Sequence, residues 1–355
     1  MTSSLTPASP AEFADAVRSA PRVIVVGAGT KPRLARVAGE FTRISTAKLC
    51  GIVEYEPSEF TFTALAGTPL REIVAALAER GQYLPFDPML AEAGATLGGT
   101  VSAGLSGPGR WRFGGLRDFI LGVRFVDGAG RLLSMGGKVV KNAAGFDLPK
   151  FFVGSAGRFG ALAELTFKVF PRPRALRTLR LDAKVSTTKM RMMNEAANTR
   201  WELDALEASI EEPAVFARIG GPPAALDALG AEILARFPGA VLADDEADDF
   251  WRTITGFRWA RTDGELAKLV LTPAQVPDFA ALVRGQAGAR GWVGAGGNVG
   301  YISVPPGASL AALPWPGVTL RGEGPLWLGP RSNFAVTRAI KDALDPNQRF
   351  PNLDD

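Results

Sequence analysis

The sequence predicts an α+β protein with a glycine-rich first domain and a second domain of different composition. Segments in which apolar and polar residues alternate, as in strands, lie among segments whose apolar residues recur at helical spacing. The chain has 355 residues, of which 46% are hydrophobic, so it can bury a large core, and its length favours two or three domains. Glycine becomes rarer after residues 171–174, where prolines and arginines cluster.

The first domain begins with a helix and a strand. Residues 9–12 form a capping box, and Phe13 and Val17 follow at helical spacing. Residues 23–26 are all apolar and predict a strand that leads directly into residues 27–30, Gly-Ala-Gly-Thr. Taken alone, this loop fits a nucleotide-binding turn and a plain tight turn about equally well.

A second helix and three more strands are predicted further along. Thr68 is the expected N-cap of the helix, with Pro69 in its first turn, and Gly81 ends it. Residues 119–134 predict a β-hairpin around the turn Asp-Gly-Ala-Gly. Residues 161–170 alternate in the manner of another strand.

The rest of the chain predicts a separate α+β domain and a C-terminal helix. Residues 177–237 read as strand, helix, strand, strand, helix, and a similar pattern covers residues 266–304. Residues 333–344 predict the last helix, which Ser332 caps and Asp345-Pro346 ends.

Composition excludes several kinds of chemistry. The chain has no histidine, which excludes a histidine base, a Ser-His-Asp triad and metal ligation by histidine. Its single cysteine, Cys50, excludes an internal disulfide and any iron–sulfur or zinc site built from thiolates of this chain alone. No metal site is predicted. The residues identify no catalytic base, and proton transfer would need Lys, Asp, Glu, Tyr or a partner protein.

Charge and hydropathy favour a cytoplasmic protein. The N-terminus lacks a signal-peptide pattern, and no run of about 18 apolar residues predicts a transmembrane helix. The net charge is only +4, without a concentrated lysine–arginine tract, so we expect no nucleic-acid partner.

Three glycine clusters point to one extended cofactor. Residues 94–115 contain eight glycines among 22 residues, and the other clusters are residues 27–30 and 154–160, each beside a predicted strand. Glycine permits positive φ and close approach of backbone amides to phosphate oxygens. Three arginines lie in or beside the longest cluster: Arg110, Arg112 and Arg117. A flexible linker is the alternative, which the interleaved apolar residues oppose. Neither the Rossmann nor the Walker spacing is present.

Polar and aromatic residues outside the clusters have simpler interpretations. We expect Asp118 and Asp147 to accept hydrogen bonds from loop amides. The polar side chains of residues 138–142 are either solvated or directed at a ligand. The aromatic residues of 251–259 favour core packing over contact with a cofactor or a partner.

These clusters, in this order, resemble the FAD-binding domain of the vanillyl-alcohol-oxidase/PCMH flavoprotein superfamily. Within it, the chain is most similar to the FAD-binding subunits, or E subunits, of bacterial glycolate oxidases. Two runs carry this resemblance: GATLGGTVSAGLSGPGRWRFGGLRDFILGVRFVDGAG and GGKVVKNAAGFDLPKFFVGSAGRFGALAELTFKVFPRP. The closing LDPNQRF matches the C-terminal signature of the family.

The resemblance implies a domain arrangement and a cofactor. Residues 1–172 would form a two-part PCMH-type FAD-binding domain, and residues 173–325 an α+β cap domain with an antiparallel sheet. Residues 326–355 would return to the FAD domain. Contacts to FAD would come mainly from backbone and small side chains: Gly27, Ala28, Gly29, Thr30, Ala95, Thr96, Gly98, Gly99, Ala103, Gly104, Gly157, Gly160, Ala161 and Leu162.

The resemblance also implies a function. The chain would be the FAD-binding subunit of a complex that oxidises glycolate, or another small 2-hydroxy acid, to glyoxylate or its analogue. Its partners would be a sibling FAD-binding subunit and an iron–sulfur subunit, and electrons would pass to a membrane acceptor. The chain would reach the inner face of the membrane only through these partners. Because relatives that oxidise 2-hydroxy acids commonly use histidines, which this chain lacks, we expect the partner to carry the substrate chemistry. The alternatives are a stand-alone FAD oxidoreductase and a non-catalytic scaffold.

Overall fold

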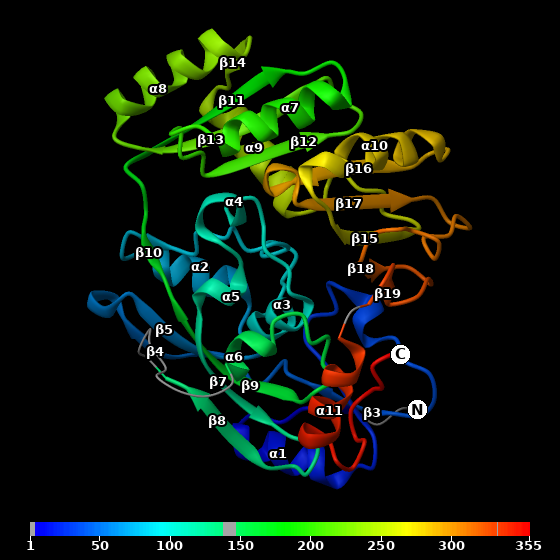
Figure 1. The fold of residues 1–355 in the computed structure, drawn as a ribbon. Helices are drawn as coiled ribbons and strands as arrows, with labels where there is room; N and C mark the ends of the chain where they lie inside the picture. Colours follow the sequence, from blue (N-terminus) through cyan, green and yellow to red (C-terminus); the bar gives the residue numbers. More distant parts are fainter. Residues whose placement is uncertain (1–3, 138–146, 332) are drawn as a thin grey trace. The chain divides into compact units, whose positions relative to one another are not determined.

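The computed structural model describes residues 4–137, 147–331 and 333–355, and these form two compact units. Unit 1 comprises Met1–Ser106, Gly115–Pro171 and Arg331–Asp355, and unit 2 comprises Gly107–Gly114 and Arg172–Pro330. The glycine-rich segment is therefore divided between the units. Its first part forms helix α3 (Leu97–Ala103) in unit 1, and its second part forms the short helix α4 (Arg110–Phe113) in unit 2 (Figure 1).

Unit 1 contains three sheets. A parallel sheet has the order β1-β3-β2, a five-stranded antiparallel sheet has the order β4-β5-β9-β7-β8, and β6 pairs with β10. The strands are β1 (Ser4–Leu5), β2 (Val23–Val26), β3 (Thr42–Ser45), β4 (Ile52–Glu56), β5 (Thr61–Leu65), β6 (Gln82–Tyr83), β7 (Ile120–Val126), β8 (Leu132–Gly136), β9 (Ala161–Lys168) and β10 (Phe170–Pro171).

Helix α1 (Pro10–Ser19) joins the core of unit 1, and its start follows the predicted capping box. The Ser9 hydroxyl accepts a hydrogen bond from the Glu12 amide at 3.2 Å. Phe13 and Val17 are fully buried, and their cluster includes residues of the parallel sheet and of the five-stranded sheet. The apolar face of α1 therefore contributes to one core that both sheets share.

The second helix begins differently from the prediction. Helix α2 spans Leu70–Ala78, and Pro69, not Thr68, occupies its N-cap position. The Thr68 hydroxyl instead lies 2.6 Å from the Leu65 carbonyl oxygen and accepts from the Gly51 amide at 2.9 Å. Thr68 is fully buried, and its hydroxyl is satisfied by Gly51 and Leu65 instead of by an amide of the helix.

The predicted hairpin is confirmed. Strands β7 and β8 pair with Val126 opposite Leu132, and the Asp127 carboxylate in the turn accepts from the Arg131 amide at 2.8 Å. The remaining helical segments of unit 1 are η1 (Pro32–Ala35), η2 (Pro57–Glu59), α5 (Leu116–Phe119), α6 (Leu148–Phe151) and α11 (Phe334–Leu344). Helix α11 matches the predicted C-terminal helix, and its expected cap, Ser332, lies outside the described residues.

Unit 2 is built on one antiparallel sheet of nine strands, in the order β14-β11-β13-β12-β16-β17-β15-β18-β19. The strands are β11 (Ala175–Asp182), β12 (Ala205–Ser209), β13 (Ala214–Gly221), β14 (Gly239–Val241), β15 (Glu265–Val270), β16 (Arg290–Gly294), β17 (Val299–Val304), β18 (Gly317–Arg321) and β19 (Trp327–Leu328). The helical segments are α7 (Ser186–Ala197), α8 (Pro223–Arg236), α9 (Asp244–Thr255), α10 (Val276–Gly285), η3 (Pro273–Gln275) and η4 (Ala295–Gly297). Elements β11, α7, β12, β13 and α8 follow one another in the predicted order of strand, helix, strand, strand and helix.

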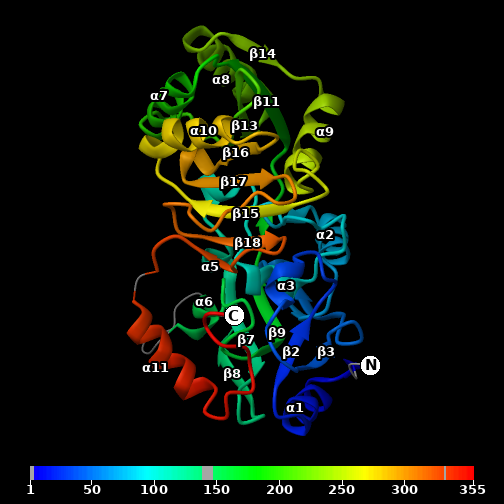
Figure 2. The same ribbon diagram turned by 90° about the vertical axis from the view of Figure 1, so that its right-hand side faces the viewer.

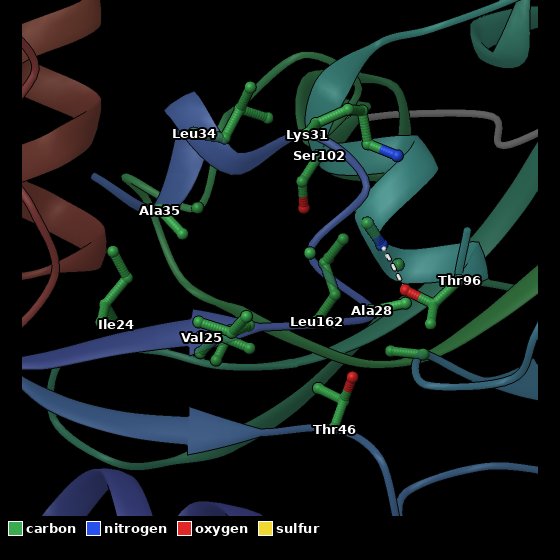
Figure 3. A pocket seen from close by; sticks show the side chains of 18 of the residues that line it. Ile24, Val25, Ala28, Lys31, Leu34, Ala35, Thr46, Thr96, Ser102 and Leu162 are labelled. Atoms are coloured by element: carbon green, nitrogen blue, oxygen red, sulfur yellow. Dashed lines mark hydrogen bonds between the residues drawn. The ribbon is translucent and has the colours of Figure 1, made fainter. Parts of the chain in front are cut away.

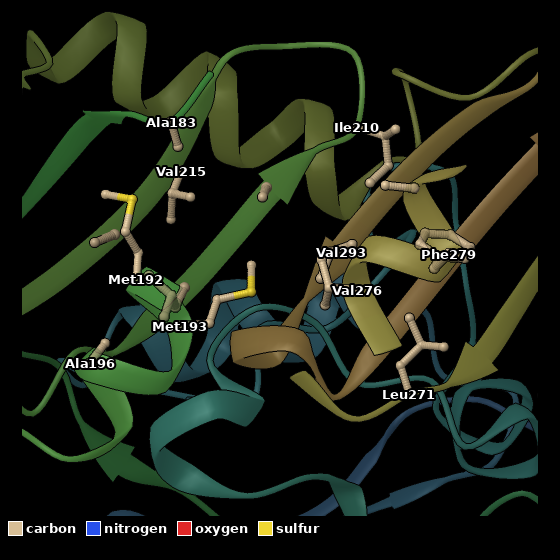
Figure 4. Close-up of a cluster of buried hydrophobic side chains, with 14 of the residues drawn as sticks. Ala183, Met192, Met193, Ala196, Ile210, Val215, Leu271, Val276, Phe279 and Val293 are labelled. Carbon is tan, nitrogen blue, oxygen red and sulfur yellow. The ribbon is translucent and has the colours of Figure 1, made fainter. Parts of the chain in front are cut away.

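The two faces of this sheet differ in character. Helices α7 and α10 lie on one side and α9 on the other (Figure 2). On the side of α7 and α10, Met192, Met193 and Phe279 pack into one large apolar cluster with strand residues such as Val215 and Val293 (Figure 4). The other side carries polar and aromatic side chains, among them Lys268, Trp292 and Tyr301.

Candidate functional site

An open pocket of about 770 Å³ lies in unit 1, where β2 ends and the three glycine clusters meet (Figure 3). The residues that line it are Ile24, Val25, Val26, Gly27, Ala28, Gly29, Thr30, Lys31, Leu34, Ala35, Thr46, Ala66, Thr96, Gly98, Gly99, Ser102, Ala156, Gly157, Gly160, Ala161 and Leu162. One part of this lining is aliphatic and the rest is glycine-rich backbone. The pocket therefore suits a long ligand that has both an apolar ring and a polar linker.

The first loop leaves backbone donors available at the pocket. Gly29 adopts a φ of +72°, which a residue with a Cβ atom rarely takes. In the described part of the chain, no protein acceptor is found for the amides of Ala28, Gly29 and Thr30. Ala28 and Gly29 are exposed and Thr30 is half-buried, so these amides are open to water or to a bound anion.

The amides of the second glycine cluster are hydrogen-bonded within the protein instead. The amides of Leu97, Gly98 and Gly99 donate to Thr68 O, Ala66 O and Thr96 Oγ1, respectively, at 3.0, 2.8 and 3.3 Å. A Cβ atom on Gly98 would lie 2.8 Å from the Ala66 Cβ atom. Glycine is needed here because α3 packs directly against the end of β5. The expectation that these amides donate to cofactor oxygens is wrong, since the protein already uses their hydrogen atoms.

The third cluster joins the second through α3. The Gly154 amide donates to Val101 O at 2.9 Å, and the Ala156 amide donates to Ser102 O at 2.8 Å. Gly157 has a φ of +73° and open space where a Cβ atom would be. The chain then enters β9 at Ala161, which brings this backbone to the pocket wall.

The structure brings together most of the predicted site residues but not all of them. Those that line the pocket are Gly27, Ala28, Gly29, Thr30, Thr96, Gly98, Gly99, Gly157, Gly160, Ala161 and Leu162. Those outside its lining are Ala95, Ala103 and Gly104. The Ala95 carbonyl accepts from the Leu70 amide at 2.8 Å, and a Cβ atom on Gly104 would lie 3.0 Å from the Gly154 Cα atom. Ala95 and Gly104 thus tie neighbouring segments together.

Lys31 is the main pocket residue that the sequence analysis missed. Its side chain, labelled in Figure 3, is only 7% exposed. Its Nζ atom donates to Thr30 Oγ1 at 2.9 Å. Burial lowers its pKa to about 8. The signal was present in the sequence, because a lysine directly follows the loop Gly-Ala-Gly-Thr.

The other polar residues named from the sequence have structural partners. Asp118 accepts from the Gly115 amide at 2.8 Å, and Asp147 accepts from the Lys150 amide at 3.3 Å, as predicted. Arg112 does not supply charge to the pocket; it donates to Asp204 Oδ1 at 2.8 Å and to Glu202 Oε2 at 2.7 Å within unit 2. The polar segment 138–142 lies outside the described residues.

A second cluster of interest lies on the polar face of the sheet in unit 2. Lys268, Tyr301 and Trp292 are directly opposite one another on β15, β17 and β16, so their side chains share that face. The Glu207 carboxylate accepts from Trp292 Nε1 at 2.6 Å and from the Ala295 amide at 3.0 Å.

The charges around this row shift two pKa values. Burial and the positive charge of Arg110 lower the pKa of Lys268 to about 7. Burial and the nearby Glu207 carboxylate raise the pKa of Tyr301, although Arg110 opposes this shift. A lysine with a pKa near neutrality can exchange a proton at physiological pH, and its protonated form favours a small anion.

The predicted aromatic group borders this row. The Phe257 ring lies 5.1 Å from the Tyr301 ring, and the Trp259 ring lies 5.9 Å from the Trp292 ring, measured between centroids. Trp251 donates from Nε1 to the Thr178 hydroxyl at 2.9 Å. These residues pack among themselves and against the sheet, as core packing predicts.

Comparison with known proteins identifies the first domain. Residues 3–136 match the family described as "FAD binding domain". Over 221 residues the chain is 40% identical to the glycolate oxidase subunit GlcE of Escherichia coli K12, covering 60% of this chain and 61% of that protein. Over 128 residues it is 31% identical to the glycolate oxidase subunit GlcD of Bacillus subtilis 168, covering 36% of this chain and 27% of that protein. The matches thus span less than two thirds of these relatives.

The fold has known counterparts. A solved structure of alkyldihydroxyacetonephosphate synthase superposes with a TM-score of 0.69 and covers 97% of this chain and 74% of that chain. The sequence identity is only 15%, so this likeness concerns the fold. It confirms the predicted α+β architecture. No helix in residues 4–137, 147–331 or 333–355 is both long and apolar enough to cross a membrane.

The pocket fits FAD. Aliphatic residues of β2 and η1 suit an adenine ring, and the loop 27–30 offers free amides for phosphate oxygens. The glycines with positive φ leave room that side chains would fill. FAD is therefore the cofactor of this domain. Residues 3–136 therefore form a FAD-binding domain, and the chain is similar, as its sequence predicted, to a subunit of a bacterial glycolate oxidase.

Proposed function

We propose that this chain is the FAD-binding subunit of a complex that oxidises glycolate or another small 2-hydroxy acid. The observation that carries the proposal is the 40% identity to a glycolate oxidase subunit, together with a pocket whose loops fit FAD. When bound, FAD supplies a two-electron acceptor that can pass electrons on one at a time. The chain's own residues bind the cofactor through the first loop and hold the adenosine half against β2.

The partners follow from the same proposal. A sibling flavoprotein subunit would bind the hydroxy acid, and an iron–sulfur subunit would receive the electrons, because this chain has one cysteine and cannot hold a cluster alone. The lack of histidine supports this division, since the proton of the substrate hydroxyl needs a base. The complex would work in the cytoplasm and meet a membrane acceptor through its partner subunits.

A second candidate function places the substrate on this chain. The row Lys268–Tyr301 favours it, because Lys268 has a pKa of about 7 and lies near Arg110. In this version the Arg110 guanidinium binds the carboxylate, and neutral Lys268 accepts the hydroxyl proton. The chain would then be a FAD oxidoreductase for hydroxy acids in its own right.

One experiment separates these candidates. The chain is purified alone and with its two proposed partner subunits, and glycolate is added without oxygen while flavin absorption is recorded. The first candidate predicts that flavin bleaches only when the partners are present. Bleaching of the isolated chain would support the second candidate. A purified chain that does not take up FAD would instead favour a scaffold role.

A further inference from the structure

We infer that Lys31 is the charge partner of the cofactor's diphosphate and makes FAD binding dependent on pH. Nothing in the family description or in the names of the relatives assigns a role to this residue. The inference concerns how the domain holds its cofactor, and it stands whether or not the chain itself oxidises a hydroxy acid.

The Lys31 side chain has no counter-charge among the residues that the structure describes. Its ammonium group has three hydrogen atoms to donate, and its one partner among the described residues is the Thr30 hydroxyl, at 2.9 Å. The side chain is 7% exposed, so water cannot readily solvate it. A buried ammonium without an acidic partner is unfavourable unless an anion binds beside it.

The described lining of the pocket offers the cofactor no charged side chain besides Lys31. Among the described residues that line it, Lys31 alone is charged (Figure 3). The amides of residues 97–99 donate to protein oxygens and cannot neutralise phosphate. The loop 27–30 supplies amide donors but no full charge. A diphosphate carries about two negative charges, so a cation beside these amides would stabilise it.

The arginines on and near η1 do not line the pocket. Arg33 lies on η1, and it contributes to the lowered pKa of Arg158. The Arg158 guanidinium is engaged elsewhere: it donates to Leu34 O at 2.8 Å, to Ala156 O and to Asp355 O at 2.8 Å. Arg36 is exposed at the end of η1. None of these three arginines belongs to the pocket lining, whereas Lys31 does.

The pKa of Lys31 would make the affinity of the protein for FAD depend on pH. In the protein without FAD, burial lowers this pKa to about 8, so the side chain is mostly protonated at pH 7 and mostly neutral at pH 9. A bound diphosphate favours the protonated form. Above pH 8, binding must therefore take up a proton, and FAD affinity falls by up to about tenfold per pH unit.

The test measures FAD affinity of the full chain by quenching of flavin fluorescence between pH 7 and pH 9.5. The variants are Lys31→Met and Lys31→Arg, and the control is Lys48→Met, which removes an exposed lysine of the same unit. We expect K31M to weaken FAD about 10- to 100-fold at pH 7 and to abolish the pH dependence. K31R should bind tightly up to pH 9.5, and K48M should behave as the wild type.

Two further readouts identify the ligand group and exclude a structural role. ADP and adenosine compete with FAD: K31M should weaken ADP as much as FAD but leave adenosine unchanged. The melting temperature of the FAD-free K31M protein should equal or exceed that of the wild type, because a buried charge has been removed. Unchanged FAD affinity in K31M, equal losses for ADP and adenosine, loss of binding in K31R, or a lower melting temperature would each overturn the inference.

Discussion

Lys341 Nζ and Asp345 Oδ2 lie 2.5 Å apart on the last turn of α11, and both side chains are buried. Lys341 also donates to Arg158 O at 2.6 Å and to Phe350 O at 3.2 Å. Asp345 accepts from the amides of Arg349 and Phe350 at 2.8 and 3.0 Å. The pair thus explains the C-terminal signature LDPNQRF as a turn whose two ends, Asp345 and Phe350, are buried and which fixes Phe350 in the core of unit 1.

The first prediction concerns this pair. Asp345→Ala leaves the Lys341 ammonium buried without its carboxylate, so we expect a loss of about 3–5 kcal/mol in the free energy of unfolding. Urea titration followed by circular dichroism measures it. Asp342→Ala, on the exposed face of the same helix, is the control and should change stability by less than about 0.5 kcal/mol. Equal stability of the two variants would contradict a structural role for the pair.

The second prediction concerns the glycine of α3 that touches β5. Gly98→Ala places a Cβ atom 2.8 Å from Ala66 Cβ and 3.0 Å from Ala66 O, so α3 must shift. We expect about 1–3 kcal/mol of destabilisation and a lower FAD content in the purified protein, read from absorption near 450 nm. In Gly285→Ala, a new Cβ atom would meet open space, and this control should keep both properties. A stable, fully loaded G98A protein would show that the contact is not tight.

The third prediction concerns the pH dependence of stability. Lys189 is 1% exposed, and its Nζ atom donates to Ser209 O and Glu212 O at 2.5 Å each. Burial, with a contribution from Arg284, lowers its pKa to about 8 in the folded state. The unfolded chain has the ordinary value of 10.5 and binds more protons between pH 8 and 10.5. The Lys189 contribution to stability therefore rises with pH in that window.

The difference in unfolding free energy between wild type and Lys189→Met isolates this contribution, because other groups cancel. We expect the wild type to gain about 2 kcal/mol relative to K189M between pH 7.5 and 9.5. Chemical unfolding at four pH values provides the measurement. A difference that stays constant, or that falls with pH, would contradict the assigned shift.

The fourth prediction concerns where the hydroxy acid binds. If the partner subunit holds the substrate, Lys268→Met in the assembled complex should leave KM and kcat for glycolate within about twofold of the wild type, as should the exposed-lysine control Lys184→Met. Steady-state kinetics at pH 7 provide the test. A large fall in kcat that K268R does not restore would instead place the base for the hydroxyl proton at Lys268, on this chain.

Local features of the sequence predicted much of the fold. The capping box of α1, the strand β2 and the hairpin of β7 and β8 depend on neighbouring residues, so periodicity and turn chemistry are sufficient to identify them. The loop 27–30 and the cluster at Gly157 could be predicted for the same reason. Glycine beside a strand indicates a turn with positive φ, as Gly29 and Gly157 have, and this depends only on local sterics.

The tertiary structure alone decided which groups meet. Thr68 is an ideal N-cap by sequence, yet its hydroxyl bonds to Gly51 and Leu65. Gly104 packs against Gly154 rather than beside the pocket, and Arg112 pairs with acids about 90 residues away. The pocket that Lys31 lines likewise brings together segments far apart in the chain. By itself, the sequence determined the helices, strands and glycine turns, because these depend on short-range sterics and hydrogen bonding. Burial, charge pairing and pKa values arise from long-range contacts, so only the folded chain settled them.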